Sequence, residues 1–226
     1  MATIAVFGQR SFGAATADAL CKAGHHVEFV VSPADRPDGM LRDPLRAWAD
    51  ETLTEWADAA TYTDADMPDG IDLIMAAHSH TFIGQRTRAR ARMAVGYHPS
   101  LLPIHRGRDA VRWAIHMGDK ITGGSVYHLT NGIDCGPLAA QRAVLIRPDD
   151  DEHTLWARLF SVGIDLLVQV ADDYDRDRVS YVPQDEACAT WEPSWERPRL
   201  HRPELLELTA RPGSAHGARR GDGIAA

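Results

Sequence analysis

The sequence predicts an α/β fold with a mostly parallel central sheet flanked by helices. Residues 3–7 form an apolar run followed by a glycine-containing turn, which is typical of a buried strand that leads into a helix. The helical pattern continues toward Ala23, and residues 26–31 then resume an apolar strand pattern. Because a helix between two strands makes a β-α-β unit, we expect these two strands to lie parallel.

The elements that follow are read from capping residues and from the spacing of apolar side chains. Ser11 is the expected amino-terminal cap of the first helix, and Gly24 stands where a left-handed residue ends it. The next helix is expected at residues 45–57, with Trp48 and Trp56 on one of its sides. Further strands are expected at residues 73–77, 94–97, 124–129 and 138–145, and a short helix at residues 110–117.

A long helix is expected after three consecutive aspartates, because acidic side chains suit the amino end of a helix. Its apolar residues recur at helical spacing and predict a buried stripe: Leu155, Leu159, Val162, Leu166 and Val170. From Leu208 onward the chain is mostly Ala, Arg, Gly, Pro and Ser, which bury too little apolar surface to offset the entropy of ordering. We therefore expect one domain at residues 1–200 and a flexible C-terminal tail at residues 201–226.

Composition narrows the class of protein and its partners. A formal net charge of −8 argues against a nucleic-acid partner, which would normally select a basic face. The uninterrupted apolar runs are far shorter than the roughly 20 residues that cross a bilayer, and no signal peptide is visible, so no membrane partner and a cytoplasmic location are expected. Cys21, Cys135 and Cys188 have no metal-ligand spacing and are expected to be free thiols.

One histidine and one aspartate form the best candidate site. His98 lies between a predicted strand and a loop, and Pro99 forces it toward extended geometry. At the carboxyl end of a strand in an open α/β sheet, such an imidazole faces the crevice where ligands bind. Asp134, in a later turn, is its expected partner, because a nearby carboxylate favours the imidazolium and creates a proton donor near neutral pH. The alternative is a hydrogen-bonded core histidine and an unrelated surface aspartate.

A second candidate site is the glycine turn at residues 8–13. It lacks the middle glycine of a dinucleotide fingerprint, so NAD binding is disfavoured. Amide groups at a helix start can still bind an anion, which makes Gly8, Arg10 and Ser11 expected substrate-binding residues. His78 and His80 alternate along the chain, but no other ligand has suitable spacing for zinc, so no metal is expected.

Several separated blocks of the chain resemble the signature of the 10-formyltetrahydrofolate-dependent formyltransferase family. These blocks are residues 98–103, Arg106-Gly107, Thr122-Gly123 and residues 132–137. Residues 4–9 with Phe12-Gly13, and Tyr97 before His98, are most similar to the amino-terminal hydrolase domain of 10-formyltetrahydrofolate dehydrogenase. The likeness covers about residues 3–195, including residues 189–193, and implies a Rossmann-like formyltransferase fold with a catalytic domain at residues 1–200.

The resemblance implies catalytic roles for His98 and Asp134, with 10-formyltetrahydrofolate as cosubstrate. In this family an asparagine two residues before the histidine helps to bind the developing oxyanion, but this chain has Gly96 there. Loss of such a donor costs on the order of 3 kcal/mol of transition-state stabilisation. The dehydrogenase-type hydrolase domain also lacks the asparagine, which makes water a second candidate acceptor.

The family likeness also implies where the substrates bind. The folate pteridine is expected in a crevice between a strand at residues 73–83 and the loop at residues 129–134, lined by Ala76, His78, Phe82, Thr130, Asn131 and Ile133. Arg106 joins the expected substrate-binding residues. Methionyl-tRNA formyltransferases share the signature but append a tRNA-contacting barrel, for which this chain has neither the length nor the basic character.

The function expected from the sequence is therefore transfer of a formyl group to a small amine or hydroxylamine acceptor. Two alternatives stay open: hydrolysis of 10-formyltetrahydrofolate to formate, and a non-catalytic folate-binding module. Specificity for the acceptor is expected to come from surface loops such as residues 32–44, which are rich in Pro, Asp and Gly. The side chains of these loops carry no pattern that identifies the acceptor, and no feature of the sequence indicates an oligomeric state.

Overall fold

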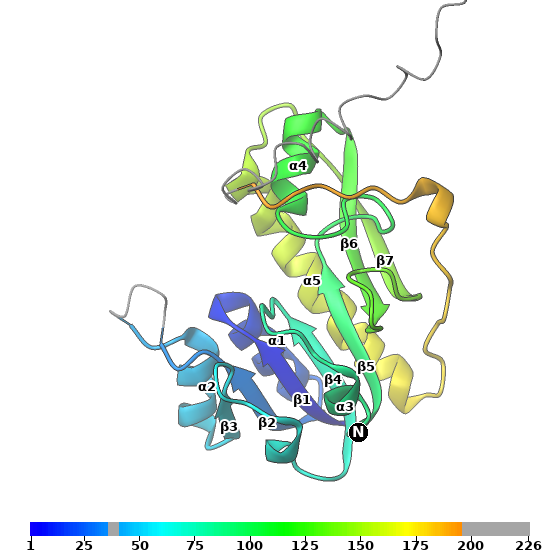
Figure 1. Cartoon of the computed structure of the whole chain (residues 1–226). Coiled ribbons are helices and arrows are strands. Elements are labelled where there is room, and N and C mark those ends of the chain that lie inside the picture. The colour runs from blue at the N-terminus through cyan, green and yellow to red at the C-terminus, as the bar shows by residue number, and fades with distance from the viewer. Residues whose placement is uncertain (36–40, 196–226) are drawn as a thin grey trace, which may run out of the picture. The chain divides into compact units, whose positions relative to one another are not determined.

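The computed structural model describes residues 1–35 and 41–195, of which residues Met1–Glu192 form one compact unit (Figure 1). Seven strands make a single sheet in the order β3-β2-β1-β4-β5-β6-β7. The predicted domain boundary at residue 200 and the predicted tail at residues 201–226 lie outside the described residues, as do residues 36–40 of the predicted surface loop.

The strands are β1 (Thr3–Gly8), β2 (His26–Ser32), β3 (Glu55–Asp58), β4 (Ile71–Ala77), β5 (Ala91–His98), β6 (Ile121–His128) and β7 (Leu138–Leu145). The α-helices are α1 (Arg10–Lys22), α2 (Pro44–Thr52), α3 (Gln85–Arg88), α4 (Ala110–Met117) and α5 (Glu152–Asp175). Two short 3₁₀ helices, η1 (Asp64–Asp66) and η2 (Glu186–Cys188), complete the described elements.

The sheet is parallel in its first part and antiparallel in its second. β1 pairs in parallel with both β2 and β4, and the pairs β2–β3 and β4–β5 are also parallel. β5–β6 and β6–β7 are antiparallel. The β-α-β unit and the mostly parallel, helix-flanked sheet that the sequence predicts are confirmed, and Gly24 has the expected left-handed φ of 93° after α1.

Two apolar cores lie on the two faces of the sheet, as alternation along a strand requires. Val6 and Met75 belong to the core that includes residues of α1, α2 and α5, whereas Phe7 and Ile74 belong to the core on the other face. The first core lies between the sheet and a layer of helices that includes α1 and α5 (Figure 1). The second face carries the carboxyl end of β5 and hence the candidate site.

The predicted apolar stripe of α5 is buried at Leu155, Leu159, Leu166 and Val170. Leu155 and Leu159 pack with Val111 of α4, while Val162 is half-buried against the core that contains Leu166 and Val170. The helix is also long and apolar enough to cross a membrane by length and composition alone, with a mean hydropathy of 1.4. Polar and charged residues interrupt the apolar sequence of this helix, so the length of uninterrupted apolar runs does not reveal it. Its buried side chains contact the sheet and the other helices, which is the arrangement of a core helix.

One predicted helix is wrong over its second half. Helix α2 ends at Thr52, because Leu53 has a left-handed backbone with φ 57°, and residues Glu55–Asp58 form strand β3. Pairing with β2 supplies backbone hydrogen bonds that outweigh the weak helical preference of this short segment. Trp48 and Trp56 therefore lie on different elements, and the indole of Trp56 donates to the Ser32 hydroxyl at 2.8 Å.

Candidate active site

His98 is the last residue of β5, and the loop that follows folds back over its side chain. The imidazole is 8% exposed, and its Nε2 lies 2.6 Å from the backbone carbonyl oxygen of His105. A carbonyl oxygen can only accept a hydrogen bond, so Nε2 carries a hydrogen. The other ring nitrogen, Nδ1, faces the carboxylate of Asp134 at 3.5 Å.

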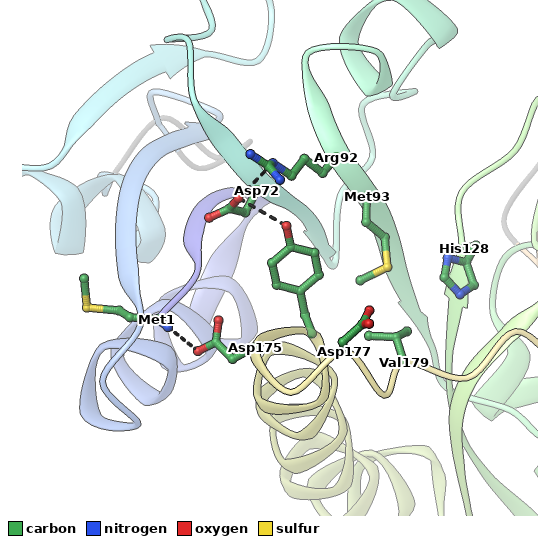
Figure 2. A pocket seen from close by; sticks show the side chains of 9 residues that line it. Met1, Asp72, Arg92, Met93, His128, Asp175, Asp177 and Val179 are labelled. Carbon is green, nitrogen blue, oxygen red and sulfur yellow. Dashed lines mark hydrogen bonds and ion pairs between the residues drawn. The ribbon is translucent and has the colours of Figure 1, made fainter.

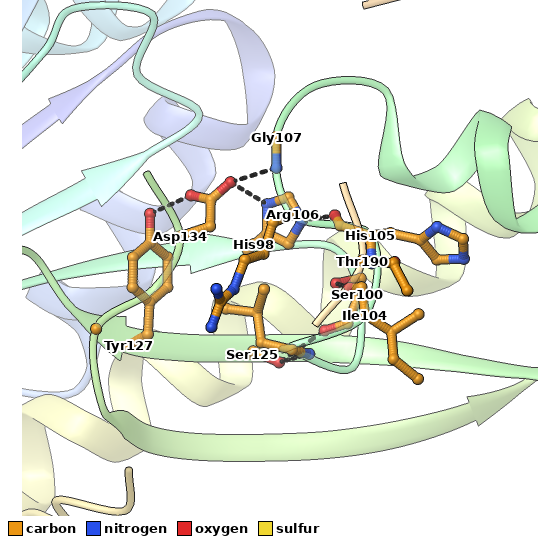
Figure 3. Close-up of polar contacts among 12 residues, drawn as sticks. His98, Ser100, Ile104, His105, Arg106, Gly107, Ser125, Tyr127, Asp134 and Thr190 are labelled. Carbon is orange, nitrogen blue, oxygen red and sulfur yellow. Dashed lines mark hydrogen bonds and ion pairs between the residues drawn. The ribbon is translucent and has the colours of Figure 1, made fainter. Parts of the chain in front are cut away.

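Asp134 lies in the turn between β6 and β7 with a left-handed φ of 52°. Its Oδ2 accepts a hydrogen bond from the Gly107 amide at 2.7 Å, and its Oδ1 accepts one from the Tyr127 hydroxyl at 2.5 Å (Figure 3). The carboxylate is 12% exposed, so it is not the surface group of the alternative interpretation. The structure thus brings together the two side chains that the sequence pairs, and their catalytic role stays a prediction.

Gln184, in the segment after α5, forms hydrogen bonds to both loops of the candidate site. The Gln184 amide nitrogen donates to the carbonyl oxygens of Asp134 at 2.9 Å and Gly136 at 2.6 Å. Its side-chain oxygen accepts from Arg106, at 2.8 Å from Nη2 and 3.2 Å from Nε. One side chain therefore links the Asp134 turn to the His98 loop.

Arg106 was expected to bind substrate, but its buried guanidinium makes four hydrogen bonds to Gln184 and Glu186. The hydrogen bonds that Arg106 donates to the Glu186 carboxylate raise the pKa of the guanidinium and lower the pKa of the carboxyl group. These contacts give Arg106 a structural role between the loop and the following segment. A contact with substrate stays a prediction.

His105, which the sequence did not single out, anchors the same loop. Its side chain is 4% exposed, with Nε2 2.8 Å from a carboxylate oxygen of Asp119 and Nδ1 3.1 Å from one of Glu192. Its backbone amide donates to the Thr190 hydroxyl at 2.8 Å. Contacts of the His105 side chain and of its backbone amide therefore fix the position of the carbonyl that accepts the His98 hydrogen bond.

The residues predicted to line a folate crevice lie on two segments with unequal exposure. Ala76 pairs with Gly96 in the β4–β5 register, so it lies on the same sheet face as His98. Phe82 and Ile133 are large apolar residues that are 66% and 57% exposed. Thr130 is half-buried, and exposed Asn131 accepts a hydrogen bond from Arg88 at 2.6 Å.

The strand expected at residues 73–83 ends earlier than predicted. β4 stops at Ala77, and His78 has a left-handed φ of 63° that is incompatible with continued strand geometry. Burial lowers the pKa of His78 to about 4, with smaller contributions from His80 and Arg10, so this side chain is neutral at pH 7. Among residues 1–35 and 41–195, no group of three His, Cys, Asp or Glu side chains could hold a metal ion.

The turn between β1 and α1 differs in part from the predicted anion site. Gly8 is required by packing, since a Cβ there would lie 2.3 Å from the carbonyl oxygen of Ala77. The predicted cap at Ser11 is wrong, because α1 already begins at Arg10. The Arg10 amide donates to both oxygens of the buried Asp43 carboxylate, at 3.0 and 2.9 Å. The Asp43 carboxylate thus already accepts the hydrogen bond of the first amide of α1. Substrate contacts by the exposed Arg10 and Ser11 side chains stay predictions.

A pocket of about 630 Å³ lies at the other end of β4 and β5 (Figure 2). Its lining includes Asp72, Arg92 and Asp175, together with the amino-terminal Met1. These charges are paired with one another: Arg92 lies 3.4 Å from Asp72, and the terminal amine lies 2.6 Å from Asp175. The pairing favours a structural role for this end of the sheet and leaves the His98 end as the candidate for chemistry.

A family model described as "Formyl transferase" matches residues 2–171 of the 226. The chain belongs to the formyl transferase family. The resemblance seen in the sequence and the Rossmann-like formyltransferase fold that it implies are therefore confirmed, and members of this family are enzymes that use formyl-tetrahydrofolate.

Similar proteins from this family differ in their acceptors. Methionyl-tRNA formyltransferase of Anaeromyxobacter sp. (strain K) is 34% identical over 200 residues, which cover 83% of this chain and 63% of that protein. Mitochondrial 10-formyltetrahydrofolate dehydrogenase of Mus musculus is 32% identical over 216 residues, with 86% and 23% covered. The chain thus spans less than two thirds of the length of these curated relatives.

A solved structure of a third kind of formyl transferase has a similar fold. Glycinamide ribonucleotide transformylase 1 from Geobacillus kaustophilus superposes with a TM-score of 0.61 and is 28% identical. The match covers 75% of this chain and 96% of that one. Formyl transfer is therefore common to the family, while the acceptor differs from one relative to another.

Proposed function

We propose that this formyl transferase moves a formyl group from 10-formyltetrahydrofolate to a small amine or hydroxylamine. The observation that carries the proposal is the approach of His98 Nδ1 to Asp134 at 3.5 Å at the carboxyl end of β5. Ligands of open α/β sheets bind in the crevice outside this end of the strands. Membership of the family supports the formyl donor, and the approach of His98 to Asp134 supports a proton donor at this end of the sheet.

The two segments beside the pair suit a flat apolar ring such as a pteridine. Phe82 and Ile133 expose large apolar side chains, and Ala76 pairs with Gly96 on the sheet face that carries His98. Polar groups for the ring edge are available on the Thr130 to Asp134 turn. These features favour folate binding by the predicted residues Ala76, His78, Phe82, Thr130, Asn131 and Ile133.

The hydrogen bonds of His98 assign separate tasks to its two nitrogens. Nε2–H is committed to the His105 carbonyl and fixes the ring, whereas Nδ1 is too far from Asp134 for a short hydrogen bond. Nδ1–H is therefore the donor for the negative charge that develops on the formyl oxygen when a neutral amine attacks. The Asp134 carboxylate lies beside this ring, and a water molecule carries the proton that the amine loses to N10 of the folate. The bond between N10 and the formyl carbon breaks as N10 is protonated, and tetrahydrofolate leaves.

The class of acceptor is supported by charge and by one kind of relative. A net charge of −8 disfavours a nucleic-acid acceptor, and the name of the Geobacillus structure indicates a small ribonucleotide acceptor. The expected contacts for an anionic part of the acceptor are Gly8, Arg10, Ser11 and Arg106. We also propose that the protein acts in the cytoplasm, in one-carbon metabolism.

Hydrolysis is the second candidate, with water as the acceptor. It is favoured by Gly96, which offers no side-chain donor next to His98, and by the similarity to 10-formyltetrahydrofolate dehydrogenase. The same His98–Asp134 pair would serve both reactions. Only the acceptor distinguishes them.

Mass spectrometry of an amine library incubated with 10-formyltetrahydrofolate tests the proposal. We expect one class among amino sugars, hydroxyornithine-type compounds and nucleotide-precursor amines to gain the mass of one carbonyl group. Efficient formate release without any amine would identify a hydrolase and contradict a dedicated transferase. Tight folate binding with no loss of formyl under either condition would identify a non-catalytic folate-binding module.

A further inference from the structure

Tyr127 contacts the candidate catalytic aspartate but lies outside the blocks that carry the family resemblance. It is a residue of β6 with an exposed fraction of 8%. Its hydroxyl donates to Oδ1 of Asp134 at 2.5 Å, while Oδ2 receives the Gly107 amide and faces His98. Each oxygen of the carboxylate therefore has its own donor (Figure 3).

The hydroxyl of Tyr127 uses space that Gly96 leaves open. The two residues are directly paired in the β5–β6 register, so their side chains belong to the same face of the sheet. A Cβ at position 96 would lie 3.4 Å from the Tyr127 hydroxyl and 3.0 Å from Cδ2 of Leu129. A Cβ would therefore press on Leu129 and only touch the phenol, whereas a side chain that extends beyond Cβ would press on the phenol as well.

We propose that Tyr127 is a positioning residue for Asp134, and that Gly96 is needed to admit it. The inference rests on the proposed function, because it concerns the geometry of the His98–Asp134 pair. With Oδ1 bound to the phenol, rotation of the carboxylate is restricted and Oδ2 stays directed at His98 and Gly107. Without the phenol, a buried carboxylate oxygen loses its donor.

The protonation state of Tyr127 is consistent with a donor. Burial, followed by the charge of Asp134, raises the pKa of Tyr127 well above its usual range. The phenol therefore keeps its hydrogen at neutral pH. It orients Asp134 and does not act as a base.

Tyr127→Phe tests the proposal by removing only the hydroxyl. A hydrogen bond to a charged group accounts for about 10-fold to 100-fold in rate, so we expect kcat to fall by that factor. KM for 10-formyltetrahydrofolate should stay within about twofold, because the ring and its packing are kept. A kcat close to that of the wild type would overturn the proposal.

Tyr97→Phe is the matched control. Tyr97 is also largely buried on a neighbouring strand, but its hydroxyl donates to the backbone carbonyl of Leu159 at 2.8 Å, away from the pair. We expect its kcat to stay within about twofold of the wild type. Equal losses in the two phenylalanine variants would show a general packing effect and overturn the positioning role.

Gly96→Val tests the spatial link. A Cβ alone would already lie 3.4 Å from the phenol oxygen, so the γ-methyl groups of valine should lower kcat in the wild type by pressing on the phenol, and should lower it much less in Tyr127→Phe. The two substitutions are expected to couple by at least about fivefold in a double-mutant cycle. Independent effects, which multiply, would contradict the link between Gly96 and Tyr127.

A measurement without substrate separates this inference from the proposed function. In proton NMR, the Tyr127 hydroxyl should give a slowly exchanging downfield resonance that is absent in Tyr127→Phe and shifted in Asp134→Asn. Absence of the resonance in the wild type would overturn the contact itself. Its presence in a protein that transfers formyl to no acceptor and to no water would support the contact while contradicting the proposed function.

Discussion

Asp72 and Asp134 lie at opposite ends of the central strands, yet each carboxylate accepts hydrogen bonds in the same pattern. For Asp72, at the start of β4, the Thr3 amide donates to Oδ2 at 3.0 Å and the Tyr174 hydroxyl donates to Oδ1 at 3.1 Å. For Asp134, a backbone amide and a tyrosine hydroxyl donate to the same two oxygens. The difference between the two sites therefore lies in the third partner.

That third partner is a permanent cation in one site and a titratable group in the other. Asp72 faces Arg92 at 3.4 Å, and the Arg92 side chain is 78% exposed. Asp134 faces His98, whose side chain is 8% exposed. An arginine does not release its proton at physiological pH, whereas the two nitrogens of an imidazole can both donate and accept a proton. The two carboxylates thus have similar hydrogen-bond donors, but only the Asp134 site, whose third partner is a buried histidine, is a candidate for proton transfer.

Substitution of the two aspartates gives the largest contrast. We expect Asp134→Asn to lower formyl turnover by about 10²-fold to 10⁴-fold, the usual contribution of acid–base groups, because an amide cannot stabilise the imidazolium. Asp72→Asn should leave turnover within about twofold, since its site takes no part in the reaction. Consumption of 10-formyltetrahydrofolate at saturating substrate measures both. Comparable losses in the two variants would remove the distinction between the sites.

The sequence predicts the centre of the Asp134 site better than its surroundings. His98 and Asp134 stand in separated blocks with prolines and glycines that fix local geometry, so their pairing can be inferred from the order of those blocks. The strands that position them are also predictable, because continuous apolar runs mark buried strands. The resemblance to a family adds the direction in which the two segments must face.

The contacts around the pair could not be predicted, because they join segments that are far apart in the chain. Gln184 and Tyr127 bear no local pattern that marks them, since an amide and a phenol are common on surfaces and in sheets. No local pattern shows that Glu186 binds Arg106, so the substrate contact expected for Arg106 does not anticipate this ion pair. The left-handed Leu53 likewise leaves no signal, which is why β3 was missed.

His78 follows the carboxyl end of β4, and its substitution is expected to have an effect of intermediate size. Its pKa in the folded protein is about 4, below the value of 6.5 for an unperturbed histidine. Between these values the unfolded chain binds more protons, so stability is present above pH 6.5 and falls as the pH falls toward 4. We expect the free energy of unfolding to decrease by about 2 kcal/mol more between pH 7 and pH 5 in the wild type than in His78→Gln.

Urea unfolding of the wild type and of His78→Gln at pH 7 and pH 5 measures this difference. All other titratable groups are the same in the two proteins, so their contributions to the pH dependence cancel. Parallel pH dependence in the wild type and the variant would mean that His78 is solvated in the folded protein. In that case its predicted place in an apolar wall for the pteridine would also be wrong.

The smallest effect is expected for Tyr174, the counterpart of Tyr127 in the Asp72 site. Its hydroxyl donates over a longer distance, to a carboxylate that is 24% exposed and is also bound by Arg92. Water can replace the hydroxyl there, so Tyr174→Phe should lower the free energy of unfolding by no more than about 1 kcal/mol. Turnover should not change. If Tyr174→Phe instead slowed the reaction as much as Tyr127→Phe, loss of a tyrosine hydroxyl from either aspartate would have the same effect. The role of the Tyr127 hydroxyl would then not depend on the contact between Asp134 and His98.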